Sequence, residues 1–126
     1  MLWLFNNINV LLQKDKQKNS TETPPVTIII AAYNEADILE KKIRNTLAID
    51  YPVEMVKLVV VTDGSVDKSE TIVKQFPEIK LLHQTERQGK YAAIKRAMQT
   101  VTTPFVVFSD ANSMLNPECL KKIMPH

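Results

Sequence analysis

The sequence is poor in the residues on which several kinds of functional site depend. It has only two glycines, which leaves no G-x-G-x-x-G dinucleotide fingerprint and no Walker phosphate loop. Its single cysteine, Cys119, excludes an internal disulfide and a zinc site built from cysteines. The net charge of +2 comes from basic residues spread along the chain, without the concentrated basic stripe that nucleic-acid binding requires. We therefore expect no nucleic-acid partner.

Long hydrophobic runs are also missing, and the apolar N-terminus is too short to cross a bilayer. Residues 1–12 are apolar but interrupted by asparagines, whereas a membrane-spanning helix needs about 20 apolar residues. They also lack the basic start and the small-residue cleavage site of a signal peptide. We expect an apolar helix over 1–12, which either packs on protein or contacts a membrane surface. Residues 13–25 are polar, end in two prolines and are predicted to form a linker.

Three strand-like apolar runs each end in a polar, acidic cluster. The runs are residues 27–32, 58–62 and 105–109, and the clusters that follow them are 33–35, 63–67 and 110–112. Continuous apolar runs of this length are typical of strands buried on both faces, as in a parallel sheet covered by helices. In such sheets ligands bind beyond the carboxyl ends of the strands. The three clusters therefore mark the expected functional site.

Strands and helices alternate along the rest of the chain. We predict strands over 26–32, 56–62, 79–83 and 105–109, and helices over 35–48, 67–75 and 90–100, with a short helix after Asn116-Pro117. In the first helix Ile38, Leu39, Ile43 and Leu47 recur at helical spacing. This alternation predicts an α/β fold in which right-handed crossovers build a parallel sheet of about four strands, with helices on both faces.

Asp63 is a candidate ligand-binding residue because it follows the second apolar run and precedes Gly64. Glycine lets the chain turn sharply and lets a ligand approach the backbone closely. An ionised carboxylate only accepts hydrogen bonds, which suits the imide N–H of uracil or a pair of ribose hydroxyls. The alternative is that Asp63 and Ser65 only shape the turn, and that Ser65 or Asp67 caps the next helix. We favour ligand binding for Asp63 and the cap for Asp67.

Asp110 and Asn112 are candidate metal ligands at the end of the last predicted strand. Mg²⁺ or Mn²⁺ takes one or two protein oxygens together with diphosphate oxygens, although the same Asp-x-Asn pattern is also typical of an Asx-turn. Gly89 and Lys90 open the third predicted helix, where backbone N–H groups and an ammonium would face phosphate oxygens. Taken alone, Lys90 and Arg87 also fit solvated surface residues.

Four segments together resemble the family-2 glycosyltransferases of the GT-A fold. They are VTIIIAAYNE (26–35), VVVTDGSVD (59–67), RQGKYAAIKR (87–96) and FSDAN (108–112). The resemblance covers about residues 26–124 and implies a Rossmann-like GT-A half-domain that binds a nucleotide sugar, with UDP as the expected nucleotide. It implies nucleotide binding by Ala31, Tyr33, Glu35, Asp63, Gly64, Arg87, Gly89, Lys90 and Asp110, and metal binding by Asp110 and Asn112.

The resemblance also implies an activity, namely inverting transfer of a sugar from a nucleotide-diphosphate sugar to a glycan or lipid acceptor, with Mn²⁺ or Mg²⁺ as cofactor. Many family members are membrane enzymes that make polysaccharides or glycolipids, so we expect a cytoplasmic protein, either free or at the inner face of the cell membrane. The family's general base follows the Asp-x-Asp element at a distance, and no residue after Asn112 matches it. We expect that base beyond residue 126, with residues 26–126 as the donor-binding part, the acceptor half missing, and no turnover by this chain alone.

Two other functions share parts of this pattern. A receiver-like signalling domain has the same alternation and would use Asp63 as its phospho-acceptor, but its first strand would end in paired acids rather than Ala-Ala-Tyr-Asn. A degenerate transferase domain would act as a binding module. In either case an exposed edge of the predicted sheet offers a route to self-association.

Overall fold

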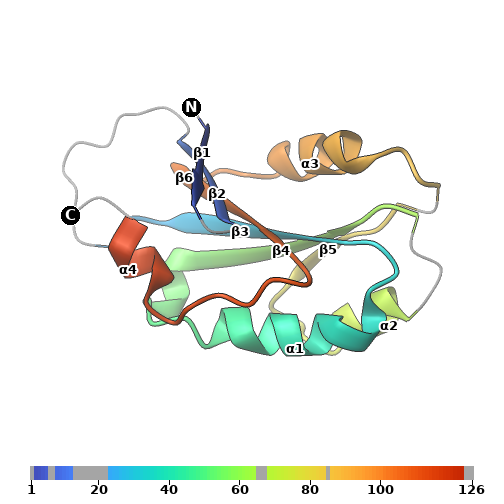
Figure 1. Ribbon diagram of the computed structural model, residues 1–126, viewed down its shortest axis with the longest axis horizontal. Coiled ribbons are helices and arrows are strands. Elements are labelled where there is room, and N and C mark those ends of the chain that lie inside the picture. The colour runs from blue at the N-terminus through green and yellow to red at the C-terminus, as the bar shows by residue number, and fades with distance from the viewer. Residues whose placement is uncertain (1, 6–7, 13–22, 65–67, 85, 124–126) are drawn as a thin grey trace.

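One sheet of six strands runs through the described part of the protein (Figure 1). The structure is a computed structural model, and it describes residues 2–5, 8–12, 23–64, 68–84 and 86–123. The strands are β1 (Leu2–Phe5), β2 (Ile8–Leu12), β3 (Val26–Ala32), β4 (Val56–Thr62), β5 (Lys80–Leu82) and β6 (Phe105–Asp110). The helices are α1 (Ala36–Leu47), α2 (Ser69–Val73), α3 (Lys90–Met98) and α4 (Cys119–Ile123), with a short 3₁₀ helix, η1, at Val53–Met55.

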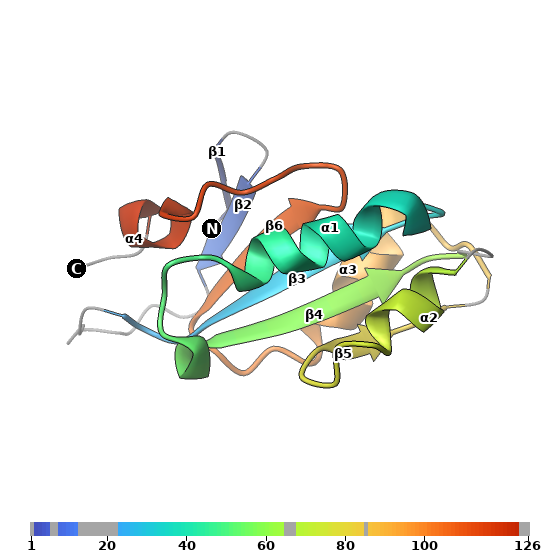
Figure 2. The same cartoon turned by 90° about the horizontal axis from the view of Figure 1, so that it is seen from below.

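Four strands of this sheet are mutually parallel, which confirms the predicted α/β fold. The sheet order is β1-β2-β6-β3-β4-β5, so β3 lies between β4 and β6. Helix α3 covers one face of the sheet, and α1 and α2 cover the other (Figures 1 and 2). The chain adds β4 and β5 on one side of β3 and then crosses to the other side with β6. Open α/β sheets bind ligands at such a reversal of strand order, just beyond the strand ends.

Alternation of side chains along the strands divides the core into two layers. In β6, Val107 belongs to the layer beneath α1, whereas Val106 and Phe108 belong to the layer beneath α3. Successive residues of a strand point to opposite faces of the sheet. The end of β6 therefore directs Ser109 toward α1 and Asp110 toward α3.

The N-terminal segment forms strands, so the expectation of a helix over residues 1–12 is wrong. β1 pairs with β2, and β2 pairs with β6, both in antiparallel register. Without β2, β6 would be an edge strand with a row of unpaired backbone N–H and C=O groups. The aromatic and β-branched residues of this segment favour extended backbone, which suits pairing with that edge. An interfacial helix is therefore not the form that these residues take, and the edges of the described sheet are β1 and β5.

The other predicted elements are present with shifted ends. Helix α2 is shorter than the predicted 67–75, and the caps expected at Ser65 and Asp67 lie outside the described residues. The same holds for most of the predicted linker, residues 13–22. The short helix predicted after Asn116-Pro117 is present as α4, and the side-chain oxygen of Asn116 caps the turn that leads into it by accepting a 2.8 Å hydrogen bond from the N–H of Glu118.

Helix α1 differs from its predicted apolar face in one respect. Leu47 is 43% exposed, whereas Lys42 and Thr46 are buried alongside Leu39 and Ile43. The hydroxyl of Thr46 is satisfied within the helix because it donates a 2.9 Å hydrogen bond to the Lys42 carbonyl. The buried face of α1 therefore contains a lysine whose partners must come from outside the helix.

Candidate functional site

A pocket lies at the carboxyl ends of the parallel strands, where the strand order reverses between β3 and β6. The register places Ala31 of β3 between Val61 of β4 and Asp110 of β6. The pocket is lined by Ala31, Ala32, Tyr33, Glu35, Val61, Asp63, Arg87, Lys90, Ala93, Asp110 and Asn112. The structure thus brings the predicted site residues together at one place, except for Gly64 and Gly89, which do not line it.

The turn after β3 contributes Tyr33 and Glu35 to the lining of the pocket. Asn34 has a φ of 50°, a left-handed conformation that asparagine tolerates better than most residues. One carboxylate oxygen of Glu35 accepts a 3.2 Å hydrogen bond from the N–H of Tyr33, and the Glu35 carbonyl accepts hydrogen bonds from the N–H groups of Ile38 and Leu39 in α1. Glu35 therefore shapes the turn as well as lining the pocket.

Asp63 is 6% exposed and links the end of β4 to the start of α3. Its two oxygens accept hydrogen bonds of 2.8 Å from the N–H of Gln88 and 2.7 Å from the N–H of Gly89. A carboxylate has about four lone-pair sites, so these two bonds leave acceptor capacity on a side chain that lines the pocket. The alternatives of ligand binding and turn shaping are therefore compatible, because the same group has the geometry for both.

The two glycines support this arrangement from outside the pocket. Gly64 has a φ of 78°, and a Cβ added there would lie 2.7 Å from the Cβ of Arg87 and 2.9 Å from its backbone N. Its own N–H donates a 2.8 Å hydrogen bond to the carbonyl of Gln84. Gly89 has a φ of 104° and nothing within 4 Å of an added Cβ. Gly64 is therefore required because Arg87 lies too close for a side chain at this position. Gly89 is required only because its φ is positive.

The guanidinium of Arg87 lies over the ring of Tyr33, with 3.7 Å between the Arg87 Cζ and the ring centroid. This cation–π contact joins the turn after β3 to the segment before α3 across the pocket. Tyr33 keeps 44% of its surface exposed, so part of its ring remains open to solvent. The pocket rim thus combines an aromatic face with a fixed positive charge.

Asp110 and Lys90 both line the pocket and form a pair, with 3.7 Å between Oδ1 of Asp110 and Nζ of Lys90. Among the described residues, no group of three or more His, Cys, Asp or Glu side chains could hold a metal ion by itself. A carboxylate and an amide oxygen at Asp110 and Asn112 nevertheless fit Mg²⁺ or Mn²⁺, since these ions take few protein oxygens when phosphate supplies the others. The donor set therefore fits a cation that binds together with a diphosphate.

A buried lysine lies on the opposite face of the sheet, behind Asp110. Lys42 of α1 is fully buried, and its Nζ donates to the hydroxyl of Ser109 at 2.6 Å and to the carbonyl of Ser113. Burial lowers the pKa of Lys42 to about 8, against the smaller opposing electrostatic effects of Cys119 and Asp110. Burial likewise raises the pKa of the Cys119 thiol. The sequence motifs did not predict a role for Lys42. The one sequence feature that could have indicated it is its position in α1, next to Ile43 and three residues after Leu39, on the face that is buried.

Three pocket residues were also missed, namely Ala32, Val61 and Ala93. All three are small or β-branched apolar residues that form walls rather than polar contacts. Their spacing could have indicated them, because Val61 lies two residues before Asp63 and Ala93 lies one helical turn after Lys90.

Among the helices that the structure describes, none has the length and apolar character needed to cross a membrane.

The parallel sheet, with its pocket at the reversal of strand order, defines a Rossmann-like α/β protein with a ligand site at its strand ends. Residues 27–126 match glycosyl transferase family 2, and the chain belongs to this family. It is 25% identical over 119 residues to a poly-beta-1,6-N-acetyl-D-glucosamine synthase of Staphylococcus aureus, a match that covers 92% of this chain and 28% of that protein. Glycosyltransferase AglE of Haloferax volcanii is 28% identical over 103 residues, covering 79% of this chain and 34% of AglE.

Solved structures agree on the GT-A fold. The mannosyltransferase PcManGT of Pyrobaculum calidifontis, in complex with GDP-Man and Mn²⁺, matches with a TM-score of 0.75 and 31% identity, covering 83% of this chain and 34% of that one. TarS 1–349 of S. aureus, in complex with UDP, matches with a TM-score of 0.72 and 24% identity, covering 78% and 30%. The chain therefore spans about a third of the length of these relatives.

Proposed function

We propose that the pocket is the nucleotide-sugar site of a family-2 glycosyltransferase, with the base near Tyr33 and Asp63 and the diphosphate near Lys90 and Asp110. The observation that carries this proposal is the convergence of Asp63, Lys90 and Asp110 on one pocket at the reversal of strand order. The pocket holds about 200 Å³, below the roughly 300–1,000 Å³ of complete small-molecule sites. It can therefore enclose only part of a nucleotide sugar.

We propose UDP rather than GDP as the preferred nucleotide. Uracil presents a single imide N–H, which one remaining lone pair of Asp63 can accept. Guanine presents two adjacent N–H donors on its Watson–Crick edge and would engage both carboxylate oxygens. Each of those oxygens already accepts one hydrogen bond, from Gln88 or from Gly89, so guanine would need the remaining lone pair of both oxygens, whereas uracil needs only one. The GDP-Man complex of PcManGT makes GDP the necessary comparison.

Asp110, with Asn112 beside it, would hold a divalent cation together with the diphosphate. Support comes from the donor set of this chain and from the Mn²⁺ in the PcManGT complex. A cation bound there would neutralise negative charge on a diphosphate leaving group, which is Lewis-acid catalysis. The ammonium of Lys90, 3.7 Å from Asp110, would contribute a fixed positive charge to the same phosphates.

The complete enzyme is proposed to transfer its sugar with inversion to a glycan or lipid acceptor at the cytoplasmic face of a membrane. The name of the S. aureus synthase supports a role in polysaccharide synthesis, and the name of AglE supports glycosyl transfer. The general base is proposed to lie outside the 126 residues, so this chain alone would not turn over. Family membership decides against the receiver-like alternative.

Isothermal titration with UDP, GDP and uridine, each with and without Mn²⁺, tests the proposal. We expect UDP to bind more tightly than GDP, and Mn²⁺ to strengthen UDP binding but not uridine binding. Asp110→Ala should abolish the effect of Mn²⁺, whereas Asp50→Ala, an exposed aspartate near α4, should leave it unchanged. No binding of any nucleotide would instead support a degenerate domain that serves another purpose.

A further inference from the structure

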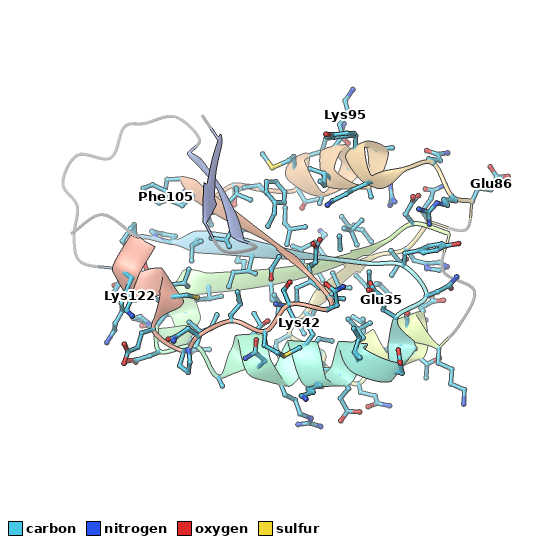
Figure 3. All side chains as sticks on the ribbon, in the orientation of Figure 1. Glu35, Lys42, Glu86, Lys95, Phe105 and Lys122 are labelled. Carbon is cyan, nitrogen blue, oxygen red and sulfur yellow. The ribbon has the colours of Figure 1, made fainter. Side chains whose placement is uncertain are left out.

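We propose that Lys42 is a positioning residue that fixes the segment from Ser109 to Ser113, and so holds Asp110 and Asn112 in place for the cation and diphosphate. The proposal rests on the proposed function of the pocket. Lys42 itself lies outside the pocket, on the opposite face of the sheet, between α1 and the loop that follows β6 (Figure 3).

The contacts of Lys42 bracket the proposed metal-binding residues. Its ammonium donates to Ser109, the residue before Asp110, and to the carbonyl of Ser113, the residue after Asn112. The buried ammonium of Lys42 therefore contacts both ends of the five-residue segment from Ser109 to Ser113. Successive side chains of β6 point to opposite faces of the sheet. The hydrogen bond from Lys42 to Ser109 on the α1 face therefore also sets the direction of Asp110 on the α3 face.

Backbone hydrogen bonds complete the same segment. The N–H of Ala111 donates to the carbonyl of Ala31 at 3.2 Å, which continues the pairing of β6 with β3. The N–H of Ser113 donates to the carbonyl of Asp110 at 3.1 Å and closes a turn around Asn112. In this turn the carbonyl of Ser113 accepts a hydrogen bond from Lys42. Removing the ammonium would therefore remove a contact that stabilises the turn, without changing any residue that lines the pocket.

A purely structural role does not require a lysine here. Lysine is almost never fully buried unless it is paired, and burying its charge is costly, whereas an apolar residue of similar length would fill the same space between Leu39 and Ile43. What an apolar residue cannot do is donate two hydrogen bonds to the ends of the Asp110 segment. We therefore assign Lys42 the role of fixing the segment from Ser109 to Ser113 through these two hydrogen bonds.

Amide hydrogen exchange of the 126-residue chain tests the structural half of the proposal without any ligand. In Lys42→Met we expect the Ala111 and Ser113 amides to exchange at least tenfold faster, with the Ile29 amide at the centre of β3 unchanged. Lys41→Met is the matched control, because it removes the same charge from the neighbouring, exposed position on α1. Should Lys42→Met fail to fold, Ser109→Ala removes one of the two partners and predicts a smaller change at the same amides.

Nucleotide titration tests the functional half. In Lys42→Met the gain in UDP affinity on adding Mn²⁺ should fall at least fivefold, while the affinity without metal stays within twofold of the wild type. Unchanged exchange at Ala111 and Ser113 would overturn the proposal, as would faster exchange with the Mn²⁺ effect intact. If the wild type shows no Mn²⁺-dependent UDP binding, the proposed function of the pocket fails, and the exchange rates still decide whether Lys42 fastens the loop.

Discussion

The Oδ2 of Asp63 lies 2.7 Å from the backbone N of Gly89, so the carboxylate that directly follows β4 fixes the residue that precedes α3. Its other oxygen accepts the N–H of Gln88 at 2.8 Å. The two bonds join the part of the pocket proposed for the base to the part proposed for the phosphates. A change at Asp63 is therefore expected to affect both the stability of the fold and the geometry of the ligand site.

Replacing Asp63 by Asn should lower the free energy of unfolding by about 1–3 kcal/mol, because the amide NH₂ would face a backbone N–H donor and leave it unsatisfied. Urea denaturation measures this change. Asp50→Asn is the control, since Asp50 is exposed and its ion pair with Lys121 is worth at most about 1 kcal/mol. Equal stability of the Asp63 and Asp50 variants would contradict the role given to Asp63.

The two glycines should respond differently to alanine. At Gly89 only backbone strain is added, and its φ of 104° and ψ of 157° lie in a region that is essentially confined to glycine, so alanine there costs about 1–3 kcal/mol. At Gly64 the new methyl group would also lie 2.7 Å from the Cβ of Arg87, so the 84–89 segment has to move. We expect Gly64→Ala to be the more destabilising variant in thermal unfolding. The reverse order would show that the close approach at Arg87 relaxes easily.

Removing the ammonium of Lys90 should affect ligand binding more than stability. The Lys90–Asp110 pair is exposed, and such pairs contribute about 0–1 kcal/mol to folding. We expect Lys90→Met to weaken UDP binding about tenfold and to leave uridine binding unchanged, because only UDP carries phosphates. Lys95→Met, an exposed lysine on the same helix (Figure 3), is the control and should bind both ligands like the wild type.

The stability of the protein should rise with pH between about 8 and 9. Burial lowers the pKa of Lys42 from 10.5 in the unfolded chain to about 8 in the fold. In this interval the unfolded state binds more protons than the folded state, so raising the pH favours folding, by up to about 1 kcal/mol per pH unit. Above pH 9 the raised pKa values of Cys119 and Tyr51 act in the opposite direction. Urea denaturation across this range should show the rise in the wild type and its loss in Lys42→Met.

The strands and the position of the site were predictable because their signals are local. Continuous apolar runs identified three of the four parallel strands, and the carboxylates that follow these three identified the edge where the pocket lies. The pairing of β3 with β6 placed Asp110 beside Ala31, as the clustering of strand ends at one sheet edge predicts. Residue type and order were sufficient for this part of the account.

The N-terminal strands and the contacts of Lys42 were not predictable in this way, because they depend on residues far apart in the chain. Residues 8–12 form a strand because they meet β6, about a hundred residues later, and nothing within the segment indicates that partner. Lys42 is likewise a buried lysine only because Ser109 and Ser113 reach it from another element. Periodicity identifies the buried face of a helix but not the polar groups that come to meet it.

The most direct test of the account is paramagnetic broadening of amide NMR signals by Mn²⁺ in the presence of UDP. If Asp110 and Asn112 hold the cation, the amides of residues 110–113 should broaden first, with Lys90 close behind. The amide of Lys57, at the opposite end of the sheet, should remain sharp, and Asp110→Ala should remove the selective broadening. Broadening that is uniform, or that centres away from residues 110–113, would contradict the proposed site.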